Sequence, residues 1–178
     1  MDEAAQRDWQ RCVDFHGHTC PGLAIGFQVA QMVIRLWGAL RSADEELVCV
    51  TENDACGVDA IQVLLGCSAG KGNLLFRLRG KSAYSFYQRG GKSVRLVLGE
   101  RPQGMTREES LAWLLERDPA ELYRVGPVHI PLPERAPLFA SHVCARCGEL
   151  TAEPWLRLVN DEKVCLDCNP PRERVCIG

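Results

Sequence analysis

Four cysteines near the end of the chain constrain its fold more than any other feature. They form two pairs, Cys144-Ala145-Arg146-Cys147 and Cys165-Leu166-Asp167-Cys168, with the spacing C-x2-C-x17-C-x2-C. This is the tetrathiolate spacing of a zinc ribbon or a related treble-clef finger. So short a segment has few apolar side chains to bury, so metal binding would supply much of its folding free energy. We therefore predict a structural zinc on Cys144, Cys147, Cys165 and Cys168. Redox chemistry of the two pairs is the alternative, but neither lies in a thioredoxin-like pattern.

A further cysteine occurs with two histidines close to the N-terminus. His16-Gly17-His18-Thr19-Cys20-Pro21-Gly22 stands directly before a long apolar run. In an extended backbone, the alternating His16, His18 and Cys20 would point to one side. Pro21 is a natural first helical residue, so Cys20 falls at or beside the helix N-cap, where the helix dipole and unpaired N–H groups favour a thiolate. The pattern predicts a site. The alternative is a turn closed by histidines next to a small buried cysteine.

A second segment, Glu52–Asp59, carries another cysteine at the start of a predicted helix. If Cys56 meets His16, His18 and Cys20, the result is a nitrogen and sulfur donor set that suits zinc or another borderline-soft ion. Fewer than four protein ligands would leave an open coordination position. We therefore assign a candidate core metal site to His18, Cys20 and Cys56.

The same segment places carboxylates close to this candidate site. Asp54 and Asp59 could orient an imidazole or transfer protons. We expect His16 or Asp54 to move protons, whereas helix capping by Asn53 or Asp54 is the alternative role. The candidate catalytic set is His16, His18, Cys20, Asp54 and Cys56.

Apolar patterning predicts helices and strands that do not alternate regularly. The run Pro21–Gly38 is apolar nearly all round, which indicates a central buried helix. Gly57–Leu65 predicts a second helix, and the capping box that begins at Thr106 predicts a third. A last helix is expected from Asp118-Pro119 to Gly126. The β-favouring runs are Leu47–Thr51, Leu74–Leu78, Ala83–Tyr87 and Val94–Leu98.

Turn-rich segments separate the last three of these runs. Arg79-Gly80-Lys81-Ser82 and Arg89-Gly90-Gly91-Lys92 have the composition of hairpin turns, which predicts an antiparallel meander. The fold class expected is α+β, with an antiparallel sheet packed with helices plus a small C-terminal four-cysteine zinc finger. Four prolines at 127, 131, 133 and 137 then indicate a stiff, extended connector. The predicted domains are an α+β core with the His/Cys site at 1–130, a Pro-rich linker at 131–140 and the zinc finger at 141–178.

Composition limits the classes of function. Ten cysteines in 178 residues, behind a charged and polar N-terminus, are typical of metal ligands and reactive thiols in a reducing compartment, so we expect a cytoplasmic protein. The net charge of −2, with mixed signs along the chain, argues against a nucleic-acid partner. Gln28, Gln31 and Arg35 interrupt the longest apolar run, which argues against a membrane span.

Three blocks of the sequence together resemble a known family. They are Phe15–Gly22, Glu52–Gln62 and Gly66–Asn73, in that order. In these blocks the chain is similar to the E-subunit family of formylmethanofuran dehydrogenase, over about residues 10–130, and the trailing finger is similar to that of many members. The resemblance implies an α+β core with a zinc-finger appendage, and a homodimer. It also supports His16, His18, Cys20 and Cys56 as the core site.

The resemblance also implies a setting for the chemistry. Family members take their name from association with molybdenum or tungsten enzymes that reduce carbon dioxide onto methanofuran. We therefore expect a metal-binding accessory protein or an oxidoreductase subunit in one-carbon redox metabolism, with a redox enzyme as partner. Its core metal, zinc or another ion, would act on a small carbonyl or formyl substrate. The alternative is a non-catalytic module that traffics a metal or cofactor, or docks an enzyme through the finger.

Overall fold

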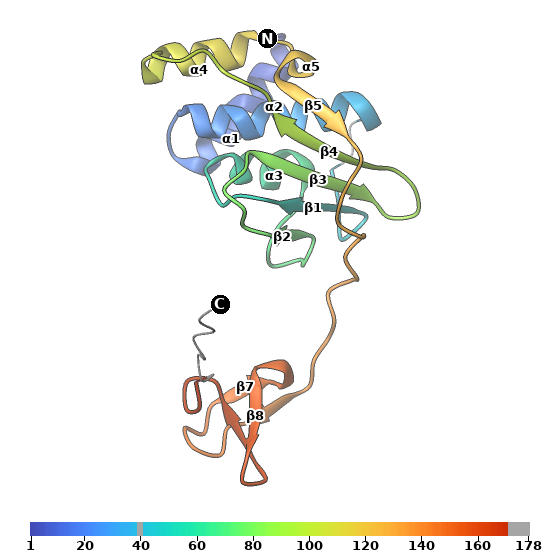
Figure 1. Cartoon of the computed structure of the whole chain (residues 1–178), viewed down its shortest axis with the longest axis vertical. Coiled ribbons are helices and arrows are strands. Elements are labelled where there is room, and N and C mark those ends of the chain that lie inside the picture. The colour runs from blue at the N-terminus through green and yellow to red at the C-terminus, as the bar shows by residue number, and fades with distance from the viewer. Residues whose placement is uncertain (39–40, 171–178) are drawn as a thin grey trace, which may run out of the picture. The chain divides into compact units, whose positions relative to one another are not determined.

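The computed structural model describes residues 1–38 and 41–170 (Figure 1). The chain divides into two compact units, Met1–Ala136 and Pro137–Gly178, which are described separately. The domain boundaries expected at 130 and 140 stay a prediction. None of the described helices is long and apolar enough to cross a membrane.

The first unit contains all the described α-helices, and four of these begin at a capping side chain. The helices are α1 (Glu3–His16), α2 (Pro21–Trp37), α3 (Gly57–Leu65), α4 (Arg107–Glu116) and α5 (Pro119–Leu122). Asp2 caps α1, Cys20 caps α2 ahead of Pro21, and the expected capping box opens α4. The sequence analysis did not predict α1. Most of its residues are charged or polar, so its one apolar face gives only a weak pattern in the sequence.

One five-stranded sheet packs against these helices, which confirms the α+β class. Its strands are β1 (Leu47–Thr51), β2 (Leu74–Phe76), β3 (Ala83–Gln88), β4 (Ser93–Leu98) and β5 (Tyr123–Gly126), in the spatial order β2-β1-β3-β4-β5. The expected meander of β2, β3 and β4 is wrong in one respect, since β1 separates β2 from β3 and pairs with β2 in parallel. The cause is α3, which crosses over between β1 and β2 and so makes a β-α-β unit. The other pairs are antiparallel.

Two other expectations about local structure are corrected. The helix expected to run from Asp118 to Gly126 ends at Leu122, and Tyr123 begins β5, where its hydroxyl donates to the Ile25 carbonyl oxygen of α2 (2.6 Å). Pairing of β5 with β4 outweighs the local helical preference. The backbone from His16 to Cys20 is not one extended strand either, because His16 is the last residue of α1.

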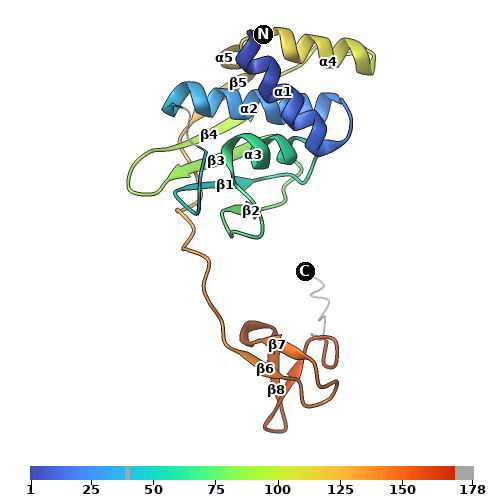
Figure 2. The same cartoon turned by 180° about the vertical axis from the view of Figure 1, so that it is seen from behind.

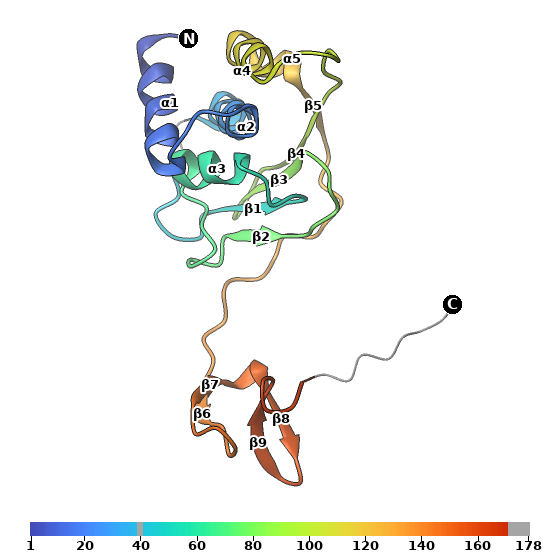
Figure 3. The same cartoon turned by 90° about the vertical axis from the view of Figure 1, so that its left-hand side faces the viewer.

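The helices cover one face of the sheet, and α2 lies at the centre of their layer (Figures 2 and 3). As the sequence predicts, α2 is buried on nearly all sides. The opposite face is covered in part by the segment after β5, where Val128 and Ile130 pack against Val48, Val50 and Tyr87.

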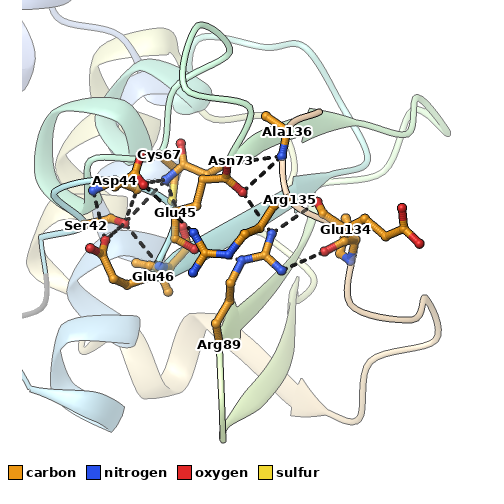
Figure 4. Close-up of polar contacts among 12 residues, drawn as sticks. Ser42, Asp44, Glu45, Glu46, Cys67, Asn73, Arg89, Glu134, Arg135 and Ala136 are labelled. Carbon is orange, nitrogen blue, oxygen red and sulfur yellow. Dashed lines mark hydrogen bonds and ion pairs between the residues drawn. The ribbon is translucent and has the colours of Figure 1, made fainter. Parts of the chain in front are cut away.

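A buried ion pair anchors the end of this covering segment. Arg89 pairs with Glu45 (3.0 Å) and also donates to the carbonyl oxygens of Pro133 and Glu134 (Figure 4). The Glu45 carboxylate accepts from the Ala136 N–H as well. Residues 127–136 are therefore not a free linker, because side chains of the core bind this proline-rich segment.

The second unit consists of two short hairpins. Strands β6 (Ser141–Val143) and β7 (Leu150–Ala152) form the first, and β8 (Leu156–Val159) and β9 (Glu162–Cys165) form the second, with the 3-10 turn η1 (Glu153–Trp155) between them. Its buried centre is small and consists of Cys144, Val164 and Cys165. A unit with so little apolar burial fits the expectation of a metal-dependent fold.

Candidate metal centre

The turn between α1 and α2 brings one histidine and one cysteine together. Gly17 ends α1 in the left-handed conformation (φ 88°), and Cys20 starts α2 three residues later. As a result, His16 Nε2 lies 3.7 Å from Cys20 Sγ. The Leu23 N–H donates to the same sulfur (3.2 Å), and Cys20 is 4% exposed. The turn between α1 and α2 therefore places an imidazole nitrogen close to a buried sulfur atom.

A close approach of α3 to α2 supplies the third side chain. A Cβ placed on Gly22 would lie 3.2 Å from Cys56 Cβ, and a Cβ on Gly57 would lie 2.9 Å from the Gly22 oxygen and the Gly26 nitrogen. A side chain at Gly57 would push against the backbone of α2, and one at Gly22 would crowd Cys56, so glycine at these positions lets the two helices come so near. Cys56, just before α3, is thereby held beside Cys20.

The three side chains form a compact donor set. The ligand atoms of His16, Cys20 and Cys56 all lie within 4.8 Å of one another. One imidazole nitrogen and two sulfurs are the donors that zinc and related borderline-soft ions prefer. Burial, and then the neighbouring Cys20 thiol, raise the pKa of Cys56 above its ordinary value. Two thiolates this close together would repel each other. A cation bound between the two sulfurs would offset that repulsion and favour the thiolate form of both cysteines. The site therefore fits a metal ion in its chemistry and its spacing.

A carboxylate orients the imidazole of this set. Asp59 Oδ2 lies 2.7 Å from His16 Nδ1, and Gln62 Nε2 donates to the other Asp59 oxygen (3.1 Å). With Nδ1 donating to Asp59, the lone pair of Nε2 faces the cysteines. A carboxylate behind a histidine ligand is a common feature of protein metal sites, where it fixes the tautomer.

The other candidate residues lie beside this group. His18 is exposed, and its ring centroid is 4.4 Å from that of His16, with the planes tilted by 39°. Asp54 is exposed and, among the described residues, its side chain makes no hydrogen bond or ion pair. The geometry thus groups His16, rather than the expected His18, with the two cysteines. The roles of all five residues stay predictions.

The finger holds a second cluster of four cysteines. The sulfurs of Cys144, Cys147, Cys165 and Cys168 all lie within 4.8 Å of one another. Hydrogen bonds from the backbone N–H groups, that of Cys147 first and that of Cys165 next, lower the pKa of Cys144 to about 6. Four thiols at this separation, one of them favoured as a thiolate, fit a tetrahedral metal ion.

Comparison with known proteins agrees with this architecture. The family model described as FmdE, Molybdenum formylmethanofuran dehydrogenase operon, matches residues 15–122. The chain belongs to the FmdE family. This confirms the family resemblance that the three sequence blocks predict. The region that the FmdE model matches holds the whole core site.

Two relatives extend the comparison. A probable S-adenosyl-L-methionine-binding protein of Archaeoglobus fulgidus is 26% identical over 191 residues, which cover 89% of this chain and 51% of the relative. The chain thus spans about half the length of that curated relative. The crystal structure of a tungsten formylmethanofuran dehydrogenase FmdE-like protein from Syntrophus aciditrophicus superimposes with a TM-score of 0.70 at 22% identity. That match covers 94% of this chain and 95% of the other, and it shows a common fold.

Sequence reasoning missed two features that build the site. The first is α1, which sets the position of His16. The second is the contact of α2 with α3 through glycine. Gly22 and Gly26 are four residues apart and so share a helix face, a pattern that indicates a close helix contact.

Proposed function

We propose that this FmdE family member binds a metal ion at His16, Cys20 and Cys56 in its core, and uses it in molybdenum- or tungsten-linked one-carbon chemistry. One observation carries the proposal: the three ligand atoms converge within 4.8 Å while Asp59 Oδ2 lies 2.7 Å from His16 Nδ1. Three protein ligands leave a fourth position for a substrate oxygen or water, as catalytic zinc sites do.

The surrounding residues suggest how the site would work. A bound zinc-class ion supplies a Lewis acid for a small carbonyl or formyl group. Asp59 holds His16 in place, and burial of Cys20 excludes water from one side of the site. His18 is exposed next to His16, where it can give a proton to or take one from a bound substrate. We propose that Asp54, which is exposed to solvent, is a second residue that carries protons to or from the site.

The family supports an accessory role around a redox enzyme. FmdE is named for the molybdenum formylmethanofuran dehydrogenase operon, which is consistent with an enzyme-subunit partner. We propose zinc for the finger, whose four sulfurs suit it, and a homodimer as the working form. The name of the Archaeoglobus relative makes S-adenosylmethionine a second small molecule to test on the intact protein.

Metal content per chain tests the core of this proposal. We expect two metal ions in the wild type, one in the double variant Cys20→Ser/Cys56→Ser, and one in Cys165→Ser/Cys168→Ser. Each double variant is the control for the other, because both remove two thiols. Elemental analysis of the purified proteins, with circular dichroism to check the fold, gives the counts.

Two outcomes would overturn the proposal. If Cys20→Ser/Cys56→Ser keeps the wild-type metal content, the core holds no metal at these residues. If the core ion binds but exchanges at once with a chelator, and small aldehydes and formyl compounds do not react, the non-catalytic trafficking role replaces catalysis.

A further inference from the structure

A positively charged pocket lies outside the core metal centre. Its volume is about 390 Å³, and its lining includes Lys81, Arg95, Arg124 and His129. On β4, Arg95 alternates with Val94 and Leu96, which are buried in the helix-covered core, so Arg95 points to the opposite face of the sheet. The pocket therefore opens away from the helices, where β4, β5 and the segment after β5 meet.

One carboxylate faces the cationic groups. Glu52 Oε1 accepts from Arg95 Nε (2.7 Å), and the two side chains are only 8% and 15% exposed. The Arg95 hydrogen bond first, and the positive charges of Arg95, Lys81 and Arg77 next, lower the pKa of Glu52. One carboxylate thus lies among several cations and does not neutralise them.

The cationic side chains keep most of their hydrogen-bonding capacity. Within the described residues, Glu52 is the single hydrogen-bond partner of the Arg95 guanidinium and engages only Nε, which leaves both terminal nitrogens available. Over the same residues, the side chains of Lys81, Arg124 and His129 make no hydrogen bond or ion pair. A pocket with fixed positive charge and open donors suits an anion.

The lining also limits the kind of anion. None of the residues that line the pocket is Phe, Tyr or Trp, so beyond the single imidazole of His129 it offers no series of aromatic rings on which successive bases would stack. Guanidinium groups match the oxygens of phosphate two at a time, which a lysine alone does not do. A small phosphate-bearing molecule fits these features better than a nucleic-acid strand.

Hydrogen bonds connect the backbone at and after Lys81 to the loop that carries Cys56. Asn53 Nδ2 donates to the Lys81 carbonyl oxygen (2.9 Å), and the Glu52 N–H donates to the Ala83 carbonyl oxygen (2.9 Å). A ligand that contacts Lys81 would therefore contact a residue that is hydrogen-bonded to the loop of the core site.

We propose that Lys81, Arg95 and Arg124 form a binding site for the phosphate group of a small molecule. The site goes beyond the proposed metal chemistry and does not depend on it, because none of its residues belongs to the metal centre. The source of the phosphate is either the free ion or a larger phosphorylated compound such as a nucleotide.

Calorimetric titration of the full-length protein tests the site with inorganic phosphate, pyrophosphate and ADP as probes. We expect one saturable site per chain, with an affinity that Arg124→Gln and Lys81→Gln each weaken roughly tenfold or more, the effect of losing a charge-assisted hydrogen bond. Both residues are exposed, so neither change should disturb folding. Arg107→Gln is the matched control, because Arg107 is an exposed arginine on α4 outside the pocket, and it should leave binding unchanged.

The outcomes separate the possibilities. Tighter binding of ADP than of phosphate supports the site with a nucleotide as source, and equal binding supports it with the free ion. The proposal is wrong if no probe binds saturably up to millimolar concentration. It is also wrong if Arg107→Gln weakens binding as much as Arg124→Gln.

Discussion

Replacing Gly26 by alanine should damage both the fold and the metal site. The new Cβ would overlap the backbone of Gly57, including its carbonyl oxygen and Cα. Since non-bonded heavy atoms need about 3.5 Å, α2 and the start of α3 must separate by more than about 1 Å. Because both partners are buried backbone rather than flexible side chains, we expect a cost of about 3 kcal/mol. The gain from alanine in a helix returns about 1 kcal/mol, which leaves a net loss of about 2 kcal/mol.

The same separation of α2 from α3 should weaken metal binding at the core site. A metal site tolerates changes in ligand distance of only about 0.2 Å, so moving Cys56 away from Cys20 should lower metal affinity at least tenfold. Urea unfolding followed by helical circular dichroism reports on the first unit, because the described α-helices all lie there. A chelator competition then measures the metal.

A second glycine provides the control for this experiment. Gly70 has an ordinary backbone conformation, and a Cβ on it would meet nothing within 4 Å. Gly70→Ala should therefore leave unfolding within about 0.5 kcal/mol of wild type and keep the metal. If Gly26→Ala behaves like Gly70→Ala in both measurements, the close packing of α2 on α3 does not build the site, and the reasoning fails.

Three other contacts lead to predictions of their own. Asp59→Asn should weaken core metal binding by about 10- to 100-fold in a chelator competition, whereas Asp54→Asn should not; equal affinities would refute the orienting role. Arg89→Ala leaves Glu45 buried without its partner, so it should cost about 3 kcal/mol and speed protease cleavage within residues 127–136; an unchanged digestion rate would contradict the anchoring. Hydrogen bonds, from the Asp44 N–H first, lower the pKa of Glu46 to about 2, so the stability that Glu46 contributes is present above about pH 4.5 and lost as the pH falls towards 2. Glu46→Gln should remove this part of the acid dependence of urea unfolding, and an identical pH profile would exclude it.

Local chemistry made much of this protein predictable from its sequence. Proline after Cys20 and a Thr-x-x-Glu box specify helix starts, and runs of β-favouring side chains specify β1, β3 and β4 to within a residue or so. The spacing of the four finger cysteines predicts their cluster, because two cysteines separated by two residues can both bind the same metal ion. In each case the residues that decide the structure are neighbours in the chain.

Tertiary structure decided which side chains meet. The sequence shows His16 and His18 as equivalent neighbours of Cys20, but the end of α1 turns His16 towards the cysteines and Asp59 holds it there, while His18 stays exposed. The parallel pairing of β1 with β2 depends on how α3 packs as it crosses between them, and the place of β5 depends on β4, which is distant in the chain. Long-range packing selects one of several arrangements that local preferences allow nearly equally, and so it could not be read from the sequence.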